Sequence, residues 1–145
     1  MSAQPSRDPR TGHFEGCYAC GPHGLGARVW IDGETARGEI ALDERHAGSP
    51  HHAHGGVVAM LLDEVLGTVS MIHGIAAVTG TLQIRYRSPA FLGRTYQLSG
   101  RLLGIEGRRL QIAGEMTGPQ GLVAEAEGTW IQVDLGHFAP ASTHG

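Results

Sequence analysis

Two glycines and one acid near the middle of the chain have the types and spacing that acyl chemistry requires. Gly55 and Gly56 begin a long apolar stretch, and Asp63 stands two helical turns further on. If a helix starts at these glycines, its first backbone N–H groups have no intrahelical acceptor and lie at the positive end of the helix dipole. Amides of this kind can stabilise an oxyanion. The stretch therefore indicates acyl chemistry.

The segment that carries these residues is expected to form one long helix, from residue 55 to residue 72 or 73. It is apolar on most faces, which is typical of a helix inside a fold. Asp63 and Glu64 interrupt it, and neighbouring helix positions point about 100° apart, so the two acids meet different surroundings. We interpret Asp63 as a buried acid on a face of small residues and Glu64 as a structural or interface acid. The small residues on the face of Asp63 are Ala59, Gly67 and Ser70.

Most of the remaining chain alternates between apolar and polar residues, with turn residues between the segments, and this pattern predicts strands. The expected strands span residues 27–31, 34–42, 76–87, 96–105, 108–117 and 122–133. With a single long helix, the sheet should be mainly antiparallel and should curl around that helix, which gives an α+β fold. One side of the sheet would still need a partner, so we expect homodimerisation by sheet extension or packing.

Size and composition fit one domain. The chain has 145 residues and a formal charge of −3, which gives no indication of binding to nucleic acid or to an anionic membrane. We expect a disordered lead at 1–12, one domain at 13–135 and a flexible tail at 136–145. The lead has no apolar core of a signal peptide, and two acids within the helix disfavour a membrane span. A cytoplasmic protein is expected.

Cys17 and Cys20 form a Cys-x-x-Cys pair that is followed by turn residues. A zinc site needs about four ligands, and the sequence has no second cysteine pair. Histidines could supply the other ligands in principle: His13, His23, His51, His52 and His54. A redox pair would need a βαβ context, which does not follow here. We favour two small, mostly buried side chains in an ordered loop, and we expect no metal and no cofactor.

Three segments together resemble the hotdog-fold thioesterases of the phenylacetate-pathway (PaaI-like) and THEM-like type. In chain order they are CYACGPHGL (17–25), HGG (54–56) with Asp63, and TGTLQIRY (79–86) followed by Pro89 and Gly93. The resemblance covers roughly residues 17–133. Some relatives have an asparagine six residues before the histidine of HGG, where this chain has Gly48. This departure favours the THEM-like subgroup.

The resemblance implies a long central helix wrapped by a curved sheet, and hydrolysis of the thioester of an acyl- or aryl-CoA. The site would lie between the two subunits of a homodimer, and such dimers can pair into tetramers. Asp63 would be the nucleophile or the general base, and the N–H of Gly55 would polarise the thioester carbonyl. His54 would shape that loop, and Thr79 would position the water or the acid across the dimer interface.

Further contacts are expected around the bound acyl-CoA. Gly56 and Met60 would line the apolar part of the site. Because CoA carries phosphates, basic groups are expected near the mouth of the tunnel. The candidates flank the turn that contains Pro89, and they are Arg85, Arg87 and Arg94; Arg108 and Arg109 form a second candidate patch.

Three other functions remain open at this point. A non-catalytic acyl-CoA-binding or sensing module could use the same fold, although the HGG start and Asp63 are both retained. A hotdog hydratase or dehydratase would need a different acid–base pair, and the spacing of nine residues from His54 to Asp63 fits thioesterases better. The third alternative is a zinc-dependent protein.

Overall fold

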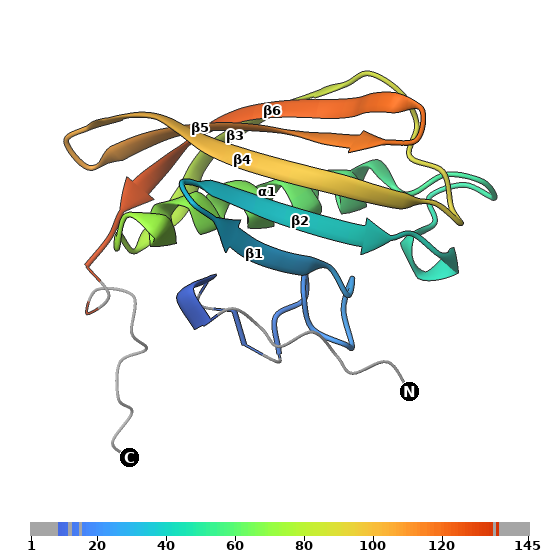
Figure 1. Cartoon of the computed structure of the whole chain (residues 1–145), viewed down its shortest axis with the longest axis horizontal. Coiled ribbons are helices and arrows are strands. Elements are labelled where there is room, and N and C mark those ends of the chain that lie inside the picture. The colour runs from blue at the N-terminus through green and yellow to red at the C-terminus, as the bar shows by residue number, and fades with distance from the viewer. Residues whose placement is uncertain (1–8, 12, 15, 135, 137–145) are drawn as a thin grey trace, which may run out of the picture.

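The computed structural model contains one long helix that lies against a single antiparallel sheet (Figure 1). It describes residues 9–11, 13–14, 16–134 and 136. The expected lead, 1–12, and the expected tail, 136–145, lie outside the described residues except for 9–11 and 136. The short 3-10 helix η1 (Pro9–Thr11) contacts β1 and the long helix.

The sheet has six strands in the order β1-β2-β4-β5-β6-β3, and every neighbouring pair is antiparallel. In chain order the elements are β1 (Arg28–Asp32), β2 (Thr35–Ala41), the 3-10 helix η2 (Glu44–His46), α1 (Gly55–Ile72), β3 (Ala77–Tyr86), β4 (Thr95–Glu106), β5 (Arg109–Gly118) and β6 (Gly121–Gln132). Each expected element is confirmed within one or two residues at its ends. The α+β class is confirmed as well.

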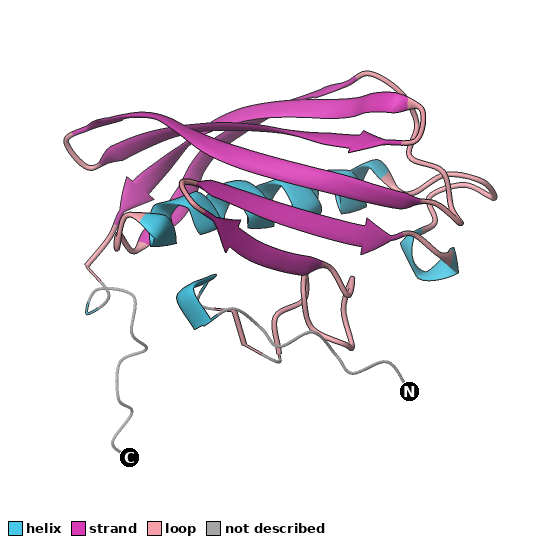
Figure 2. Cartoon of the chain, in the orientation of Figure 1, coloured by secondary structure: helices cyan, strands magenta, loops and turns pink. Residues whose placement is uncertain are grey.

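The core lies between α1 and one face of the curved sheet (Figure 2). The bulky side of α1 is buried there, through Leu61, Leu62, Val65, Leu66 and Val69. On the sheet the largest buried partners are Trp130, Tyr96, Leu110, Ile112 and Met116. By length and apolarity alone α1 could cross a membrane. Its apolar side, however, packs on the sheet, as the core helix of a globular domain does.

A second side of α1 stays open. Gly56, Met60, Asp63, Gly67 and Met71 follow one another at helical spacing, and each is partly or fully exposed. We call this row the open stripe of α1. It lies beside β3, which is the last strand of the sheet and has a neighbouring strand, β6, on one side within the described chain. The helix is therefore buried against the sheet on one side and partly or fully exposed along the open stripe.

Glycines allow the sheet to close on the helix. A Cβ on Gly114 of β5 would lie 2.1 Å from the carbonyl oxygen of Ser99 and 2.6 Å from Cδ1 of Leu66. A Cβ on Gly38 of β2 would lie 2.7 Å from Cγ2 of Val65. Since side chains cannot fit at these distances, glycine is needed where the strands cross α1.

Replacing Gly114 with alanine should therefore destabilise the protein. We expect the free energy of unfolding to fall by at least about 1–3 kcal/mol, because the contact of the new methyl group with the carbonyl oxygen of Ser99 forces a backbone shift. Gly104→Ala in β4 is the matched control, since its Cβ would meet nothing within 4 Å, and it should change stability by no more than about 0.5 kcal/mol. Denaturant titration of both variants measures this, and equal stability of the two would contradict the packing described.

Candidate active site

The start of α1 leaves one backbone amide open. His54 is the N-cap, and its Nδ1 accepts a hydrogen bond of 2.8 Å from the N–H of Gly56. The N–H groups of Val57 and Val58 both donate to the carbonyl of His54. Gly55 is an exposed residue, and its N–H donates to no acceptor among the described residues. Of the amides in the first turn, that of Gly55 is thus the one positioned to bind an incoming oxyanion.

The loop before the helix is held in place by its neighbours. The N–H of His54 donates to the carbonyl of the fully buried His46, at 2.8 Å. A Cβ on Gly48 would lie 2.6 Å from Cα of His54. An asparagine could not occupy that position without moving the loop, so the departure noted in the sequence is part of how this loop packs.

Tyr86 fixes the helix start from the other side. Its hydroxyl donates a 2.7 Å hydrogen bond to the carbonyl of Gly55, and it comes from the last residue of β3. Burial raises the pKa of Tyr86 above its ordinary value, so the hydroxyl keeps the proton that it donates. Sequence reasoning included Tyr86 in a family segment but gave it no role, because its contact is 31 residues away in the chain.

Asp63 and Thr79 are brought together. Oγ1 of Thr79 donates a 2.7 Å hydrogen bond to Oδ1 of Asp63. This contact is made within one chain, whereas the resemblance implied a contact across the dimer interface. The second carboxylate oxygen, Oδ2, accepts no hydrogen bond from the described residues.

A β-bulge explains why Thr79 reaches the helix. In β3 the core-facing residues Leu82 and Ile84 occupy even positions, so simple alternation would turn Thr79 away. The register shifts between Thr79 and Thr81, which pair with the consecutive residues Trp130 and Thr129 of β6. An extra residue in a strand changes the direction of the neighbouring side chains. The bulge therefore turns the side chain of Thr79 towards Asp63 on α1.

Asp63 lines an open cavity of about 440 Å³ together with Thr79. The other walls are Thr11, His13, Phe14, Cys17, Glu64, Gly67, Thr68, Ser70, Met71, Ala77, Val78 and Trp130. The sequence interpretation of a buried acid is wrong for the single chain, since Asp63 is partly exposed. The reason is its place on the open stripe, which the sheet does not cover. The small residues Gly67 and Ser70 line this cavity, as their shared face predicts.

Gly55 is not part of this cavity. It precedes Asp63 by eight residues on a continuous helix, which is about 12 Å along the axis at about 1.5 Å per residue. The amide and the carboxylate of one chain therefore cannot both touch one thioester carbonyl.

The expected substrate contacts are all at the surface, and they differ in their surroundings. Met60 is 37% exposed on the open stripe. The amide of Gly56 is taken by His54, and the carbonyl of Pro89 accepts from Gln120. These residues stay predicted contacts of the acyl-CoA.

The three arginines meet different partners. Arg87 forms an ion pair with Glu125, and the guanidinium of Arg94 stacks 4.3 Å from the ring centroid of Phe91. Arg85 borders a polar hollow of about 380 Å³ on the sheet face that turns away from α1. That hollow is also lined by Gln83, Arg101, Glu115, Glu125 and Glu127. Since acids surround Arg85 and Arg87, Arg94 is the best placed of the three for a phosphate.

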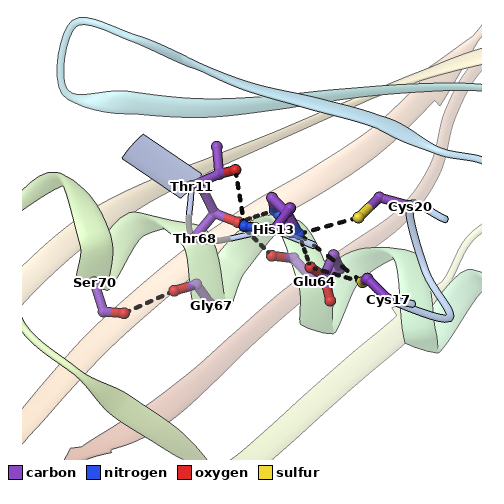
Figure 3. Close-up of polar contacts among 8 residues, drawn as sticks. All are labelled: Thr11, His13, Cys17, Cys20, Glu64, Gly67, Thr68 and Ser70. Atoms are coloured by element: carbon purple, nitrogen blue, oxygen red, sulfur yellow. Dashed lines mark hydrogen bonds and ion pairs between the residues drawn. The ribbon is translucent and has the colours of Figure 1, made fainter. Parts of the chain in front are cut away.

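The structure also assembles a cluster in which Glu64 joins Cys17, Cys20 and His13, three residues that the sequence analysis weighed as zinc ligands. His13, Cys17 and Cys20 lie against Glu64 on α1 (Figure 3). His13, Cys17 and Glu64 also line the cavity of Asp63. Burial alone would lower the pKa of His13, but the hydrogen bond and charge of Glu64 raise it above its ordinary value. Burial alone would raise the pKa of the Cys17 thiol, but hydrogen bonds with Cys20 and His13 lower it. The Cys-x-x-Cys spacing and His13 were the visible signals, and Glu64 was the ligand type not considered.

Comparison with known proteins gives a family. The family model described as the thioesterase superfamily matches residues 51–125, which is more than half of the 145 residues. No curated protein sequence matches the chain. A solved protein of the thioesterase superfamily is 32% identical, with a TM-score of 0.69 over 74% of this chain. The present chain spans 57% of the length of that relative.

Two further solved structures share the fold at lower identity. The PaaI protein of the phenylacetic acid degradation operon of E. coli is 20% identical, with a TM-score of 0.71, covering 76% of this chain and 81% of its own. A hypothetical thioesterase of Streptococcus pneumoniae, solved with coenzyme A, is 18% identical, with a TM-score of 0.69 and coverage of 74% and 85%. The expected hotdog architecture is thereby confirmed, and the chain belongs to the thioesterase superfamily.

Proposed function

We propose that this protein hydrolyses the thioester of an acyl- or aryl-CoA to the free acid and CoA, with Asp63 of one subunit and Gly55 of its partner acting on the same carbonyl. The observation that carries this proposal is the carboxylate of Asp63, oriented by Thr79 and open to a cavity. Membership of the thioesterase superfamily supports the reaction type. The coenzyme A bound to the relative from Streptococcus pneumoniae supports CoA as the carrier.

The chemistry follows from the two groups. The N–H of Gly55 binds the oxygen that becomes negative when the thioester carbonyl is attacked. Oδ2 of Asp63 either removes a proton from the attacking water or attacks the carbonyl itself. In both routes the C–S bond breaks, CoA leaves as the thiol and water supplies the oxygen of the released acid. Thr79 keeps the carboxylate aimed at the reacting carbon.

The distance along α1 requires a second subunit. If two copies of α1 lie antiparallel and cross near Ala59, residue 55 of one copy stands level with residue 63 of the other. The open stripe provides a surface for this pairing, since Gly56, Met60 and Met71 are exposed. The free side of β3 would at the same time extend the sheet into the partner. A single homodimer would therefore cover the open stripe, pair the edge strand β3 and bring Asp63 and Gly55 together in two composite sites.

Removing the carboxylate should abolish turnover and leave the fold intact. We expect Asp63→Asn to lower kcat by about 100-fold or more in a thiol-release assay over a panel of acyl- and aryl-CoAs. Thr79→Val should cost about ten- to a hundredfold, because a hydrogen bond to a charged group is lost. Thr81→Val in the same strand and Asp32→Asn at the surface are matched controls that should keep full activity. Unchanged turnover in Asp63→Asn, or CoA binding by the unaltered protein without thiol release from any substrate, would overturn the proposal.

Gly55→Pro tests the amide directly. Proline at the first position of a helix removes the N–H without breaking the helix, and His54 already has the backbone angles (φ −60°, ψ 138°) that a residue before proline prefers. We expect kcat to fall by about 10²–10³-fold with little loss of helix content.

Mixing the two variants tests the shared site. In a mixed dimer of Asp63→Asn and Gly55→Pro, one site receives both intact groups and the other receives neither. After random reassociation roughly a quarter of all sites are restored, so activity should rise well above that of either variant alone. No recovery in dimers shown to have exchanged subunits would place both groups in one chain and contradict the composite site.

A further inference from the structure

Four side chains from two distant segments meet on one side of α1 (Figure 3). His13, Cys17 and Cys20 come from the segment before β1, and Glu64 comes from the middle of the helix. Each offers one donor atom, and the four atoms lie within 4.8 Å of one another. The side chains of His13 and Glu64 are only 7% and 24% exposed. Such a cluster of two sulfurs, one imidazole nitrogen and one carboxylate oxygen is a donor set that binds metal ions.

The spacing of the donor atoms fits a tetrahedral zinc site. Zinc bonds of about 2.3 Å to sulfur and about 2.0–2.1 Å to nitrogen or oxygen place tetrahedral ligands roughly 3.3–3.8 Å apart. Nδ1 of His13 lies 3.9 Å from Sγ of Cys17 and 3.2 Å from Sγ of Cys20. Sγ of Cys17 lies 3.7 Å from Oε1 of Glu64. Nδ1 of His13 and Oε1 of Glu64 lie only 2.6 Å apart. These two atoms would have to separate by less than about 1 Å when both bind the ion.

A second layer of contacts orients the histidine. Nε2 of His13 lies 3.3 Å from Oγ1 of Thr68. The hydroxyl of Thr68 donates its own hydrogen bond to the backbone carbonyl of Glu64, at 2.8 Å. The oxygen of Thr68 is therefore the acceptor and Nε2 carries the hydrogen. In the neutral ring this leaves the lone pair on Nδ1, which faces the two sulfurs. A metal-binding histidine characteristically donates its other N–H to an oxygen in this way.

We propose that His13, Cys17, Cys20 and Glu64 bind one zinc ion, which fastens the segment before β1 to the helix. Soft thiolate ligands select zinc over magnesium or calcium. With four protein ligands the ion has no open position for water or substrate, so its role is structural. This inference does not depend on the proposed hydrolysis, and it replaces the expectation that no metal is bound.

The zinc ion would shape the candidate active site without taking part in the reaction. His13, Phe14 and Cys17 form one wall of the cavity of Asp63, and Glu64 follows Asp63 directly in α1. Fixing the histidine and the cysteines to Glu64 holds that wall beside the carboxylate. Loss of the ion should loosen the wall while the sheet and the helix persist, because the main core lies on the other side of α1.

Metal content is the first test. Untagged protein purified without chelators should contain one zinc ion per chain by elemental mass spectrometry. Cys17→Ser, Cys20→Ser and Glu64→Gln should each lower that content substantially. His23→Ala and Glu44→Gln, which change exposed side chains outside the cluster, are controls that should retain it. Removing zinc from the unaltered protein should lower its melting temperature by several degrees, and added Zn²⁺ should restore it.

Spectroscopy on the unaltered protein keeps the test decisive if a variant fails to fold. Co²⁺ loaded in place of zinc should give sulfur-to-cobalt charge-transfer absorption, and X-ray absorption of the zinc form should show two sulfurs at about 2.3 Å and two lighter ligands at about 2.0–2.1 Å. Three results would overturn the proposal. They are protein that stays free of metal after dialysis against Zn²⁺, a Cys17–Cys20 disulfide in freshly purified protein, and zinc retained in full after both cysteines are replaced.

Discussion

The structure depends on one helix that must be apolar enough to close a core and still carry charged groups that water or a polar partner can reach. Burying an unpaired carboxylate costs several kcal/mol, roughly what several hydrophobic side chains contribute. The fold meets both demands by covering only one side of α1. The sheet buries the row of leucines and valines, while Asp63 and Glu64 lie towards the opposite side. Everything proposed for this protein takes place at those two acids, outside the apolar core.

Asp63 and Glu64 are adjacent in α1, but their side chains meet different partners. Asp63 faces β3 and accepts from Thr79, whereas Glu64 faces the segment before β1, where its Oε1 lies 2.6 Å from Nδ1 of His13 and 3.7 Å from Sγ of Cys17. The angle of about 100° between neighbouring helix positions separates the carboxylate that we propose to react from the one that we propose to bind zinc. Asp63 can then act on the substrate while Glu64 binds zinc, although the two residues are adjacent in the same helical turn.

The sequence predicted the elements well because each has a local cause. The start of α1 is marked by His54 and the two glycines after it, and its end by Gly74. The strands are marked by alternating apolar and polar residues. It could not predict that Thr79 faces the helix, since the bulge beside it depends on pairing with β6. It also could not predict that Glu64 meets Cys17, because that contact spans 47 residues. Asp63 was expected to be buried because composition shows how apolar a helix is but not which side the sheet leaves uncovered.

We have proposed that one thioester carbonyl is held between Gly55 of one subunit and Asp63 of its partner. The most direct measurement is a crystal structure of the protein with an unreactive analogue of an acyl-CoA. We predict a dimer in which the carbonyl oxygen of the analogue lies about 3 Å from the N–H of Gly55, with the carboxylate of the partner subunit's Asp63 beside the carbonyl carbon. A carbonyl bound away from both groups, or bound by a single chain alone, would contradict the account.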